Sequence, residues 1–333
     1  MKTMLFNLRC AALLAAPILA VALSASTARA DGPEGYPRST VTIIVPFVPG
    51  GATDVVARLL AEALRVRWNK PVIVDNKAGA SGEIGTAYVA KARSDGLTLL
   101  LGTQTALAVS PTLSKSIAYN VEKDLTPISL LVTTPLVLLA SEKSGAKNAD
   151  DLFRLLKERP GKLSYGTSGI GTSQHLTALL FLNQLGAEAV HVPYKGSGQF
   201  LLDIAGGQLD FGFDNAATAL ALSRQGKVTA LGVTGLSRYP LEPGLPTLSQ
   251  AGLANFEAVT WLGLLGPGSL PPALTAWLNQ EVVAVLNEPA FQGKLSAQGF
   301  TTRPMLPTEF RQYIKSETER FANVIRKNGV VVE

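Results

Sequence analysis

Residues 41–54 read VTIIVPFVPGGATD, a β-branched run that leads into a loop of prolines and glycines. A second stretch, residues 162–175, reads KLSYGTSGIGTSQH, in which a strand-like run is again followed by a glycine-rich loop. After the first loop, apolar residues recur at helical spacing over residues 55–64, and Thr53 or Asp54 is placed to cap that helix. A β-branched run bounded by proline is typical of a buried parallel strand. Each stretch therefore predicts a strand–loop–helix unit of an α/β protein.

The rest of the chain continues the alternation of strands and helices. Helix-like segments such as residues 84–93 separate the strand-like runs, and two helices are expected near the end, at residues 273–287 and 307–327. The strand-like runs are residues 72–74, 97–101, 136–139, 189–192, 209–213 and 228–233. The roughly 300 residues that follow residue 30 exceed what one hydrophobic core covers. We expect two lobes, residues 31–132 with 252–333 and residues 133–251, because without the closing helices the first lobe would be much the smaller.

The first 30 residues predict export. Lys2 and Arg9 precede an apolar run at residues 10–23, and Ala28-Arg29-Ala30 matches a signal-peptidase site. Later apolar stretches are shorter than the roughly 20 residues of a membrane span. We therefore expect a soluble protein of the periplasm.

Cysteine use and net charge exclude several classes of protein. The only cysteine, Cys10, lies in the predicted signal peptide, and no small residue precedes it, so neither a disulfide nor a lipid anchor is expected. Removal of residues 1–30 takes away three basic and no acidic residues, so the formal charge falls from +5 to +2. This small charge argues against nucleic acid as a partner.

The two glycine-rich loops predict an anion site. Glycine lets backbone N–H groups converge on a ligand, and a helix that starts just afterwards adds unsatisfied N–H groups and roughly half a positive charge. Two such helix starts facing each other offset about one carboxylate. The alternative for residues 50–54 is a plain strand-to-helix turn in which Asp54 interacts only with the helix dipole.

Known catalytic and metal-binding patterns are absent from the sequence. Gln174 stands where a dinucleotide fingerprint needs its third glycine, and Ile170 stands where a hydrolase elbow needs glycine. Neither His175 nor His191 has a metal-like partner at helical spacing. We expect no metal and no cofactor. His175 is expected to brace the loop by packing and hydrogen bonding more than to act in catalysis.

Three further strand ends carry polar residues, at 103–105, 192–198 and 213–215. Ligands of open α/β sheets gather outside the carboxyl ends of strands. Lys195 could pair with a second acidic group of the ligand or lie solvated at the rim. Asp214 could accept from a ligand or cap the next helix. Trp261 is expected in the core or in a cleft wall.

These residues together resemble the periplasmic substrate-binding proteins of tripartite tricarboxylate transporters, the Bug family. The matching blocks are residues 36–37, 45–54, 95–100, 160–163, 171–176, 191–196 and 213–215. The resemblance implies a type II periplasmic binding fold, with two α/β lobes that close by a hinge over a small ligand, often a carboxylate. It also implies that the loops after the first strand of each lobe hold the ligand's carboxylate, partly through water. Two departures from the family pattern, residues 109–114 and Gln104, leave the ligand's identity open.

The leading hypothesis is an exported, monomeric receptor that delivers a small carboxylate to a membrane permease. An exported sensor for a membrane receptor, and an enzyme such as a dehydratase or transferase that uses His175 with Asp54 or Asp214, are the alternatives. No residue is assigned as catalytic. The predicted ligand-binding residues are Phe47, Gly50, Gly51, Ala52, Asp54, Thr103, Gln104, Thr105, Ser168, Gly169, Gly171, Thr172, His175, Tyr194, Lys195, Gly196, Asp214 and Asn215.

Overall fold

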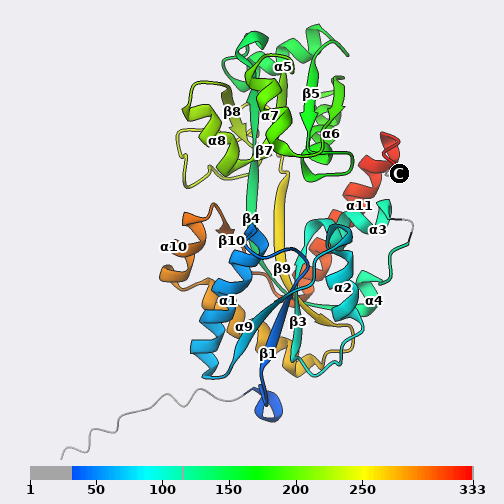
Figure 1. Cartoon of the computed structure of the whole chain (residues 1–333), viewed down its shortest axis with the longest axis vertical. Coiled ribbons are helices and arrows are strands. Elements are labelled where there is room, and N and C mark those ends of the chain that lie inside the picture. Colours follow the sequence, from blue (N-terminus) through cyan, green and yellow to red (C-terminus); the bar gives the residue numbers. More distant parts are fainter. Residues whose placement is uncertain (1–31, 115, 332–333) are drawn as a thin grey trace, which may run out of the picture. The chain divides into compact units, whose positions relative to one another are not determined.

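The computed structural model describes residues 32–114 and 116–331, so the predicted signal peptide lies outside the described residues. Strands and helices alternate along most of this length, which confirms the α/β class (Figure 1). Within the described ranges, no helix is long and apolar enough to cross a membrane.

The strands form one continuous sheet in the order β2-β1-β3-β9-β4-β7-β5-β6, and β8 and β10 pair with β4 outside this path. β1, β2 and β3 pair in parallel at one end of the sheet, and β5, β6 and β7 pair in parallel at the other. The bounds are β1 Val41–Val45, β2 Val72–Asn76, β3 Thr98–Thr103, β4 Leu125–Ala140, β5 Ser164–Thr167, β6 Val190–Pro193, β7 Phe211–Asn215, β8 Thr229–Val233, β9 Val259–Pro267 and β10 Thr301–Thr302.

The long strand β4 belongs to both ends of the sheet. Residues 125–135 of β4 pair antiparallel with β9, and residues 136–140 pair with β7 and β8. Figure 1 shows β4 and β9 side by side where the chain passes between the two groups of parallel strands. Because β4 continues without a break through residue 132, the lobe boundaries expected from size stay a prediction.

Helices cover both faces of each group of strands because strand residues alternate between the faces. In β1, Val41, Ile43 and Val45 pack with α1 and α9, whereas Ile44 packs with α11 on the other face. In the second group, α5 and α6 cover the face of β4 that carries Leu138, and α7 and α8 cover the opposite face. The bounds are α1 Ala52–Trp68, α5 Ala149–Glu158, α6 Ser173–Leu185, α7 Ser197–Ala205, α8 Ala216–Arg224, α9 Pro272–Leu286 and α11 Pro307–Lys327.

Shorter elements complete the chain. The bounds are η1 Pro33–Gly35, η2 Ala80–Gly82, α2 Glu83–Ala90, η3 Thr105–Val109 (a π-helix), α3 Ser110–Leu113, α4 Val121–Asp124, η4 Glu142–Ser144 and α10 Pro289–Ala297.

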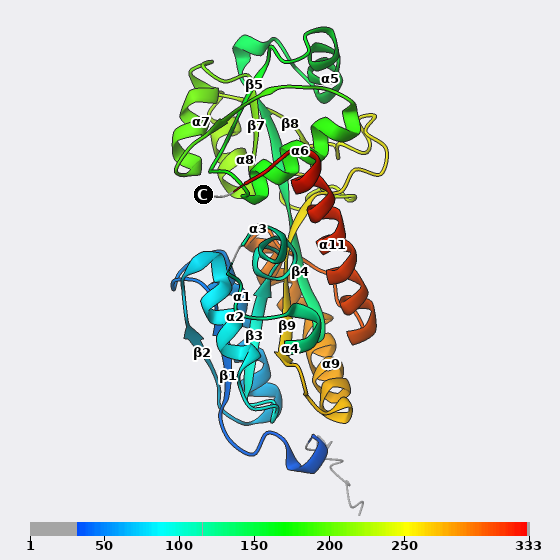
Figure 2. The same ribbon diagram turned by 90° about the vertical axis from the view of Figure 1, so that its right-hand side faces the viewer.

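The closing helices lie where the sequence placed them, to within one residue. α9 packs against β4 and α1, and α11 packs against η3 and β4. α11 also contacts α6, where Phe321, Val324 and Ile325 share an apolar cluster with Leu176 and Leu179 (Figure 2). α11 therefore contacts β4 and also α6, a helix of the second group, which the size argument did not foresee.

Candidate functional site

Two adjoining cavities lie at the carboxyl ends of the parallel strands. The larger has a volume of about 630 Å³ and the smaller about 180 Å³. Phe47 and Thr105 line both, so the two cavities meet at these side chains. The larger is lined by Phe47, Ala80, Ser81, Glu83, Thr105, Val109, Ser110, Leu113, Ser114, Ser116, Ser168, Ile170, Gly171, Thr172, Ser173 and Gln174. The smaller is lined by Phe47, Ala52, Thr53, Thr103, Gln104, Thr105, Thr134, Asn215, Thr260, Trp261, Leu262 and Phe300.

Loop 1, residues 46–51, is held from behind by Asp54. The Asp54 carboxylate is buried and accepts hydrogen bonds from Gly50 N at 2.9 Å, Arg58 Nε at 2.8 Å and Asn76 Nδ2 at 2.9 Å. Asn76 Nδ2 also donates to the carbonyl oxygen of Phe47 at 3.0 Å. The hydrogen bonds from Arg58, with those from Gly50 and Asn76, lower the pKa of Asp54 to about 2 against the opposing effect of its burial.

This arrangement changes the roles predicted for two residues of loop 1. Gly50 adopts a φ of 85°, which favours glycine, and its N–H donates to Asp54 and not into either cavity. Asp54 faces Arg58 and Asn76, and neither Asp54 nor Gly50 lines a cavity. The pair Asp54 and Arg58, four residues apart on one helix, could have been recognised from its spacing.

The start of α1 leaves donors available. Gly51 is the N-cap residue and supplies no side-chain cap. The N–H groups of Ala52 and Thr53 have no hydrogen-bond acceptor within the described part of the chain, and both residues line the smaller cavity. Such groups at a helix N-terminus attract an anion.

Loop 2, residues 168–172, is held by neutral groups. Thr172 caps α6 by accepting from His175 N at 3.4 Å, and its hydroxyl donates to the carbonyl oxygen of Gly169 at 2.8 Å. The Gly171 N–H donates to Nδ1 of His175 at 3.1 Å. Gly169 and Gly171 adopt φ values of 136° and 77°, which side-chain-bearing residues rarely adopt. Loop 2 therefore holds its shape by internal hydrogen bonds at left-handed glycines.

His175 is buried beneath loop 2. Its ring stacks on His191 with a centroid distance of 4.0 Å, and His191 stacks in turn on Tyr165. His191 Nε2 lies 2.7 Å from the Thr167 hydroxyl. Burial, with a smaller effect of His191, lowers the pKa of His175 to about 4. Since Nδ1 accepts from Gly171, the neutral ring carries its proton on Nε2, and His175 lines neither cavity. Its contacts are those of a residue that braces the loop.

Asp214 joins the starts of three helices. Its buried carboxylate accepts from Gln174 Nε2 at 3.2 Å, from the Ser197 hydroxyl at 2.9 Å and from the Thr218 hydroxyl. Gln174, Ser197 and Thr218 lie in the first turns of α6, α7 and α8. Asp214 lines neither cavity, so its observed partners are helix starts.

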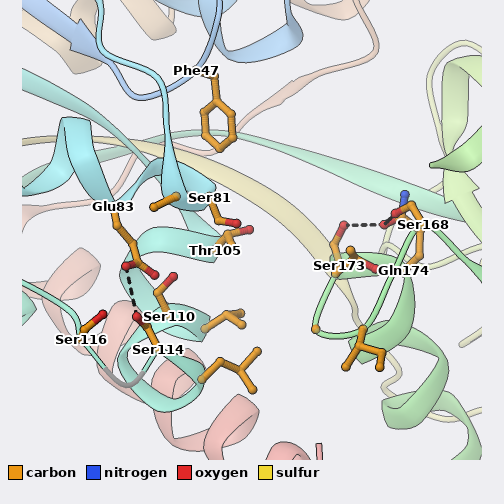
Figure 3. A pocket seen from close by; sticks show the side chains of 16 residues that line it. Phe47, Ser81, Glu83, Thr105, Ser110, Ser114, Ser116, Ser168, Ser173 and Gln174 are labelled. Carbon is orange, nitrogen blue, oxygen red and sulfur yellow. Dashed lines mark hydrogen bonds between the residues drawn. The ribbon is translucent and has the colours of Figure 1, made fainter. Parts of the chain in front are cut away.

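Gln174 is a cavity residue that sequence reasoning missed. Its Oε1 accepts from the hydroxyls of Ser168 and Ser173, at 3.0 and 3.3 Å, while its Nε2 is fixed by Asp214 (Figure 3). These three residues form one polar wall of the larger cavity. A glutamine in the first turn of a helix that follows a glycine-rich loop is the signal that could have identified it.

The remaining predicted residues divide between the cavities and other surroundings. Gln104 lines the smaller cavity, but its amide donates to Val259 O and to the buried Glu317. Tyr194 donates to Asp203, and Lys195 is exposed. Of the predicted ligand-binding residues, those that line a cavity are Phe47, Ala52, Thr103, Gln104, Thr105, Ser168, Gly171, Thr172 and Asn215. Those that line neither are Gly50, Gly51, Asp54, Gly169, His175, Tyr194, Lys195, Gly196 and Asp214.

The wall opposite Gln174 contains further residues that were not predicted as ligand-binding. Ser81 and Glu83 come from the junction of η2 and α2, and Ser110 and Ser114 come from α3 and its end (Figure 3). The last two belong to the segment 109–114, one of the two departures from the family pattern. Trp261 is buried near the start of β9 and lines the smaller cavity, where its Nε1 donates to Glu317.

The charge of the two cavities is low. Glu83 is the one acidic or basic side chain among the described residues that line them. Over the described residues, no three histidine, cysteine, aspartate or glutamate side chains are grouped as metal ligands would be. The available anion-binding groups are therefore backbone N–H groups, hydroxyls and amides.

Comparison with known proteins gives matches over most of the chain. A family model described as the tripartite tricarboxylate transporter family receptor matches residues 56–330. Protein BugT of Bordetella pertussis is 37% identical over 295 residues, which make up 88% of this chain and 90% of BugT. A solved structure of an R. palustris protein with adipate has a TM-score of 0.73 at 31% identity and covers 89% of this chain and 99% of that one. MatC from Rhodopseudomonas palustris with bound malate has a TM-score of 0.68 at 31% identity, and the match covers 87% of this chain and 100% of MatC. These likenesses confirm the two-lobe α/β fold expected from the sequence.

Proposed function

The chain belongs to the tripartite tricarboxylate transporter receptor family, and on that premise we propose that it captures a small carboxylate between its two lobes. The observation that carries the proposal is the start of α1, where Ala52 and Thr53 present free N–H groups to a cavity and no side chain caps the helix. The start of α6 lines the adjoining cavity.

The two helix starts supply the attraction for the carboxylate. Each carries roughly half a positive charge. At the start of α1, the N–H groups of Ala52 and Thr53 have no acceptor among the described residues. We propose that the carboxylate lies where the two cavities meet, beside Phe47 and Thr105. Loop 1 and loop 2 belong to different lobes, so a bound carboxylate would draw the lobes together. Binding and closure about β4 and β9 then form one linked equilibrium.

A thermal-shift screen of carboxylates tests the proposal. A ligand at 100 times its dissociation constant adds about 2.7 kcal/mol to the free energy of unfolding. We expect stabilisation by small carboxylates and none by the corresponding neutral amides. If no carboxylate stabilises the chain, or if the amides act equally well, the proposal is wrong.

The variant Gly51→Asp tests the role of the α1 start. Gly51 has a φ of −78°, and a Cβ there would make only an ordinary contact with Val48 O at 3.8 Å, so aspartate fits there. The new carboxylate would cap α1 and compete with the ligand for the same N–H groups. We expect the variant to be at least as stable as the parent and to bind carboxylates more weakly. Gly51→Ala is the matched control, and equal affinity in all three proteins would contradict the proposal.

We further propose that the chain is a binding protein without catalytic turnover. The enzyme alternative relied on His175, Asp54 and Asp214. These residues line neither cavity, and each is hydrogen-bonded to other groups of the protein. To act as general acids or bases these three residues would have to lie within reach of the ligand. Mass spectrometry of the ligand after prolonged incubation should recover it unchanged, and a new product would support the enzyme alternative.

We propose that the chain acts in the periplasm, as a monomer, with a membrane permease of the tripartite tricarboxylate type as its partner. The family description and the export signal predicted at residues 1–30 support this assignment. Pull-down of the permease by the ligand-bound chain, and weaker capture by the ligand-free chain, is expected. Ligand-dependent capture of a sensor kinase in its place would favour the alternative of an exported sensor.

A further inference from the structure

Glu83 brings a negative charge to one wall of the larger cavity. It lies at the start of α2, is half-buried, and its Oε2 accepts from the Ser114 hydroxyl at 3.1 Å (Figure 3). None of the ion pairs among the described residues includes Glu83. The polar residues near it in the cavity lining include Ser81, Ser110 and Ser114, and the apolar Val109 and Leu113 line the cavity as well.

The opposite wall is polar but uncharged. Ser168, Ser173 and Gln174 face the cavity there, at the start of α6 (Figure 3). The start of α6, with its helix dipole, suits an anion, and the carboxylate of Glu83 lies at a separate wall of the same cavity. A ligand with a second carboxylate directed toward Glu83 would place two like charges in a partly desolvated space, which disfavours binding.

We infer that Glu83 selects ligands whose far end carries an ammonium group, that is, amino acids with the amine remote from the carboxylate. This inference rests on the proposed function, because it assumes that the ligand's carboxylate lies between the starts of α1 and α6. The ammonium group would donate to Glu83 and to the adjacent serine hydroxyls, which supply acceptors without opposing charge. A dicarboxylate of the same length is rejected by the same residue.

Glu83 also lies in the first turn of α2, where a carboxylate interacts favourably with the helix dipole. Glu83→Gln would weaken that interaction, but a purely structural role would leave the ligand preference unchanged. The preference between matched ligands is therefore the decisive measurement, and the affinity for any single ligand is not.

Calorimetric titration with ligands of equal chain length tests the inference. The four-, five- and six-carbon series are succinate, 4-aminobutanoate and butanoate; glutarate, 5-aminopentanoate and pentanoate; and adipate, 6-aminohexanoate and hexanoate. At the length that fits best, we expect the amino acid to bind about tenfold more tightly than the dicarboxylate, as a favourable charge contact allows. Glu83→Gln should remove this preference, Glu83→Lys should reverse it, and Glu83→Asp should retain it in part.

Glu62→Gln is the matched control, since Glu62 is exposed on α1 and lines neither cavity. A parent protein that binds dicarboxylates more tightly, or a preference that persists in Glu83→Gln, overturns the inference while the receptor proposal stands. Lys115 follows Ser114 in the sequence and lies outside the described residues, so Lys115→Met is measured as well. A dicarboxylate preference that disappears in Lys115→Met also overturns the inference. If no carboxylate of any series binds, both the inference and the proposed function fail.

Discussion

Loop 1 and loop 2 occupy equivalent positions after the first parallel strand of each lobe, but different forces hold them. Loop 1 is fixed by a buried carboxylate, Asp54, that faces a guanidinium and an amide. Loop 2 is fixed by a threonine cap and by a neutral histidine that accepts from a glycine N–H. Under the proposed function both loops keep N–H groups at a helix start available to the ligand, and they are held once with charges and once by neutral groups.

The difference has a consequence for the ligand. Asp54 places a negative charge within the first turn of α1, but Arg58 offsets it, so the start of α1 keeps its attraction for an anion. Thr172 and His175, the side chains that hold loop 2 directly, carry no formal charge above the pKa of His175. Acid should therefore weaken the support of loop 2, and dissolved salt should weaken that of loop 1. Variants of each loop can separate the two effects.

The largest expected effect is a loss of stability in acid through His175. The unfolded chain binds a proton near the ordinary histidine pKa of about 6.5, whereas folded His175 stays neutral down to about 4. Because the folded pKa is lowered, stability is complete above the unfolded pKa and falls as the pH decreases from there toward 4. The free energy of unfolding is expected to fall by roughly 3 kcal/mol. Urea unfolding curves recorded at each pH measure this loss.

His175→Gln is the variant that isolates this effect, because the glutamine Oε1 can replace Nδ1 as an acceptor without titrating. Its stability should depend less steeply on pH over the same range. An unchanged slope would show that the acid sensitivity arises elsewhere, with His191, whose pKa burial also lowers, as the next candidate.

The second effect concerns loop 1. Asp54→Asn removes a carboxylate that accepts from Gly50, Arg58 and Asn76, and charge-assisted hydrogen bonds of this kind contribute about 2 kcal/mol. We expect the free energy of unfolding, measured with urea at neutral pH, to fall by that amount, and carboxylate binding to weaken. Asp75→Asn, an exposed neighbour paired with Lys77, is the control and should change little. A variant as stable as the parent would mean that Asp54 does not hold loop 1.

How far the sequence predicted the site follows from the same comparison. The two strand–loop–helix units were readable because β-branched runs, glycines and helical periodicity are local signals. Strand register was not readable, and it decides which residues support the loops. Val45 pairs with Asn76, which brings the Asn76 amide to the backbone of loop 1. Tyr165 pairs with His191, which brings His191 under His175.

The cavity wall around Glu83 was missed for a related reason. Its residues come from η2, α2, η3 and α3, which are short elements without a strong periodic pattern. Only the folded chain brings them opposite the start of α6. Asp214 was recognised as a polar strand end, but its three partners on α6, α7 and α8 are far apart in the sequence.

The third effect tests the cap of α6. Thr172→Ala removes both the cap on His175 N and the hydrogen bond to Gly169, at a cost of about 1 kcal/mol. Because loop 2 loses its internal bond to Gly169, carboxylate affinity should fall as well. Thr172→Ser keeps the hydroxyl and should restore both properties. Equal loss in the serine variant would assign the effect to the threonine methyl group and not to the cap.

The smallest effect is the dependence of loop 1 on salt. The Arg58 side chain is about half exposed, so its attraction to Asp54 is screened by dissolved ions. Arg58→Met should lower stability slightly at low ionic strength, and the difference should vanish near 1 M NaCl, where the Debye length is about 3 Å. The difference caused by Thr172→Ala should stay the same across this range, because no charge takes part in that cap. If both differences respond alike to salt, the division into a charged and a neutral loop is wrong.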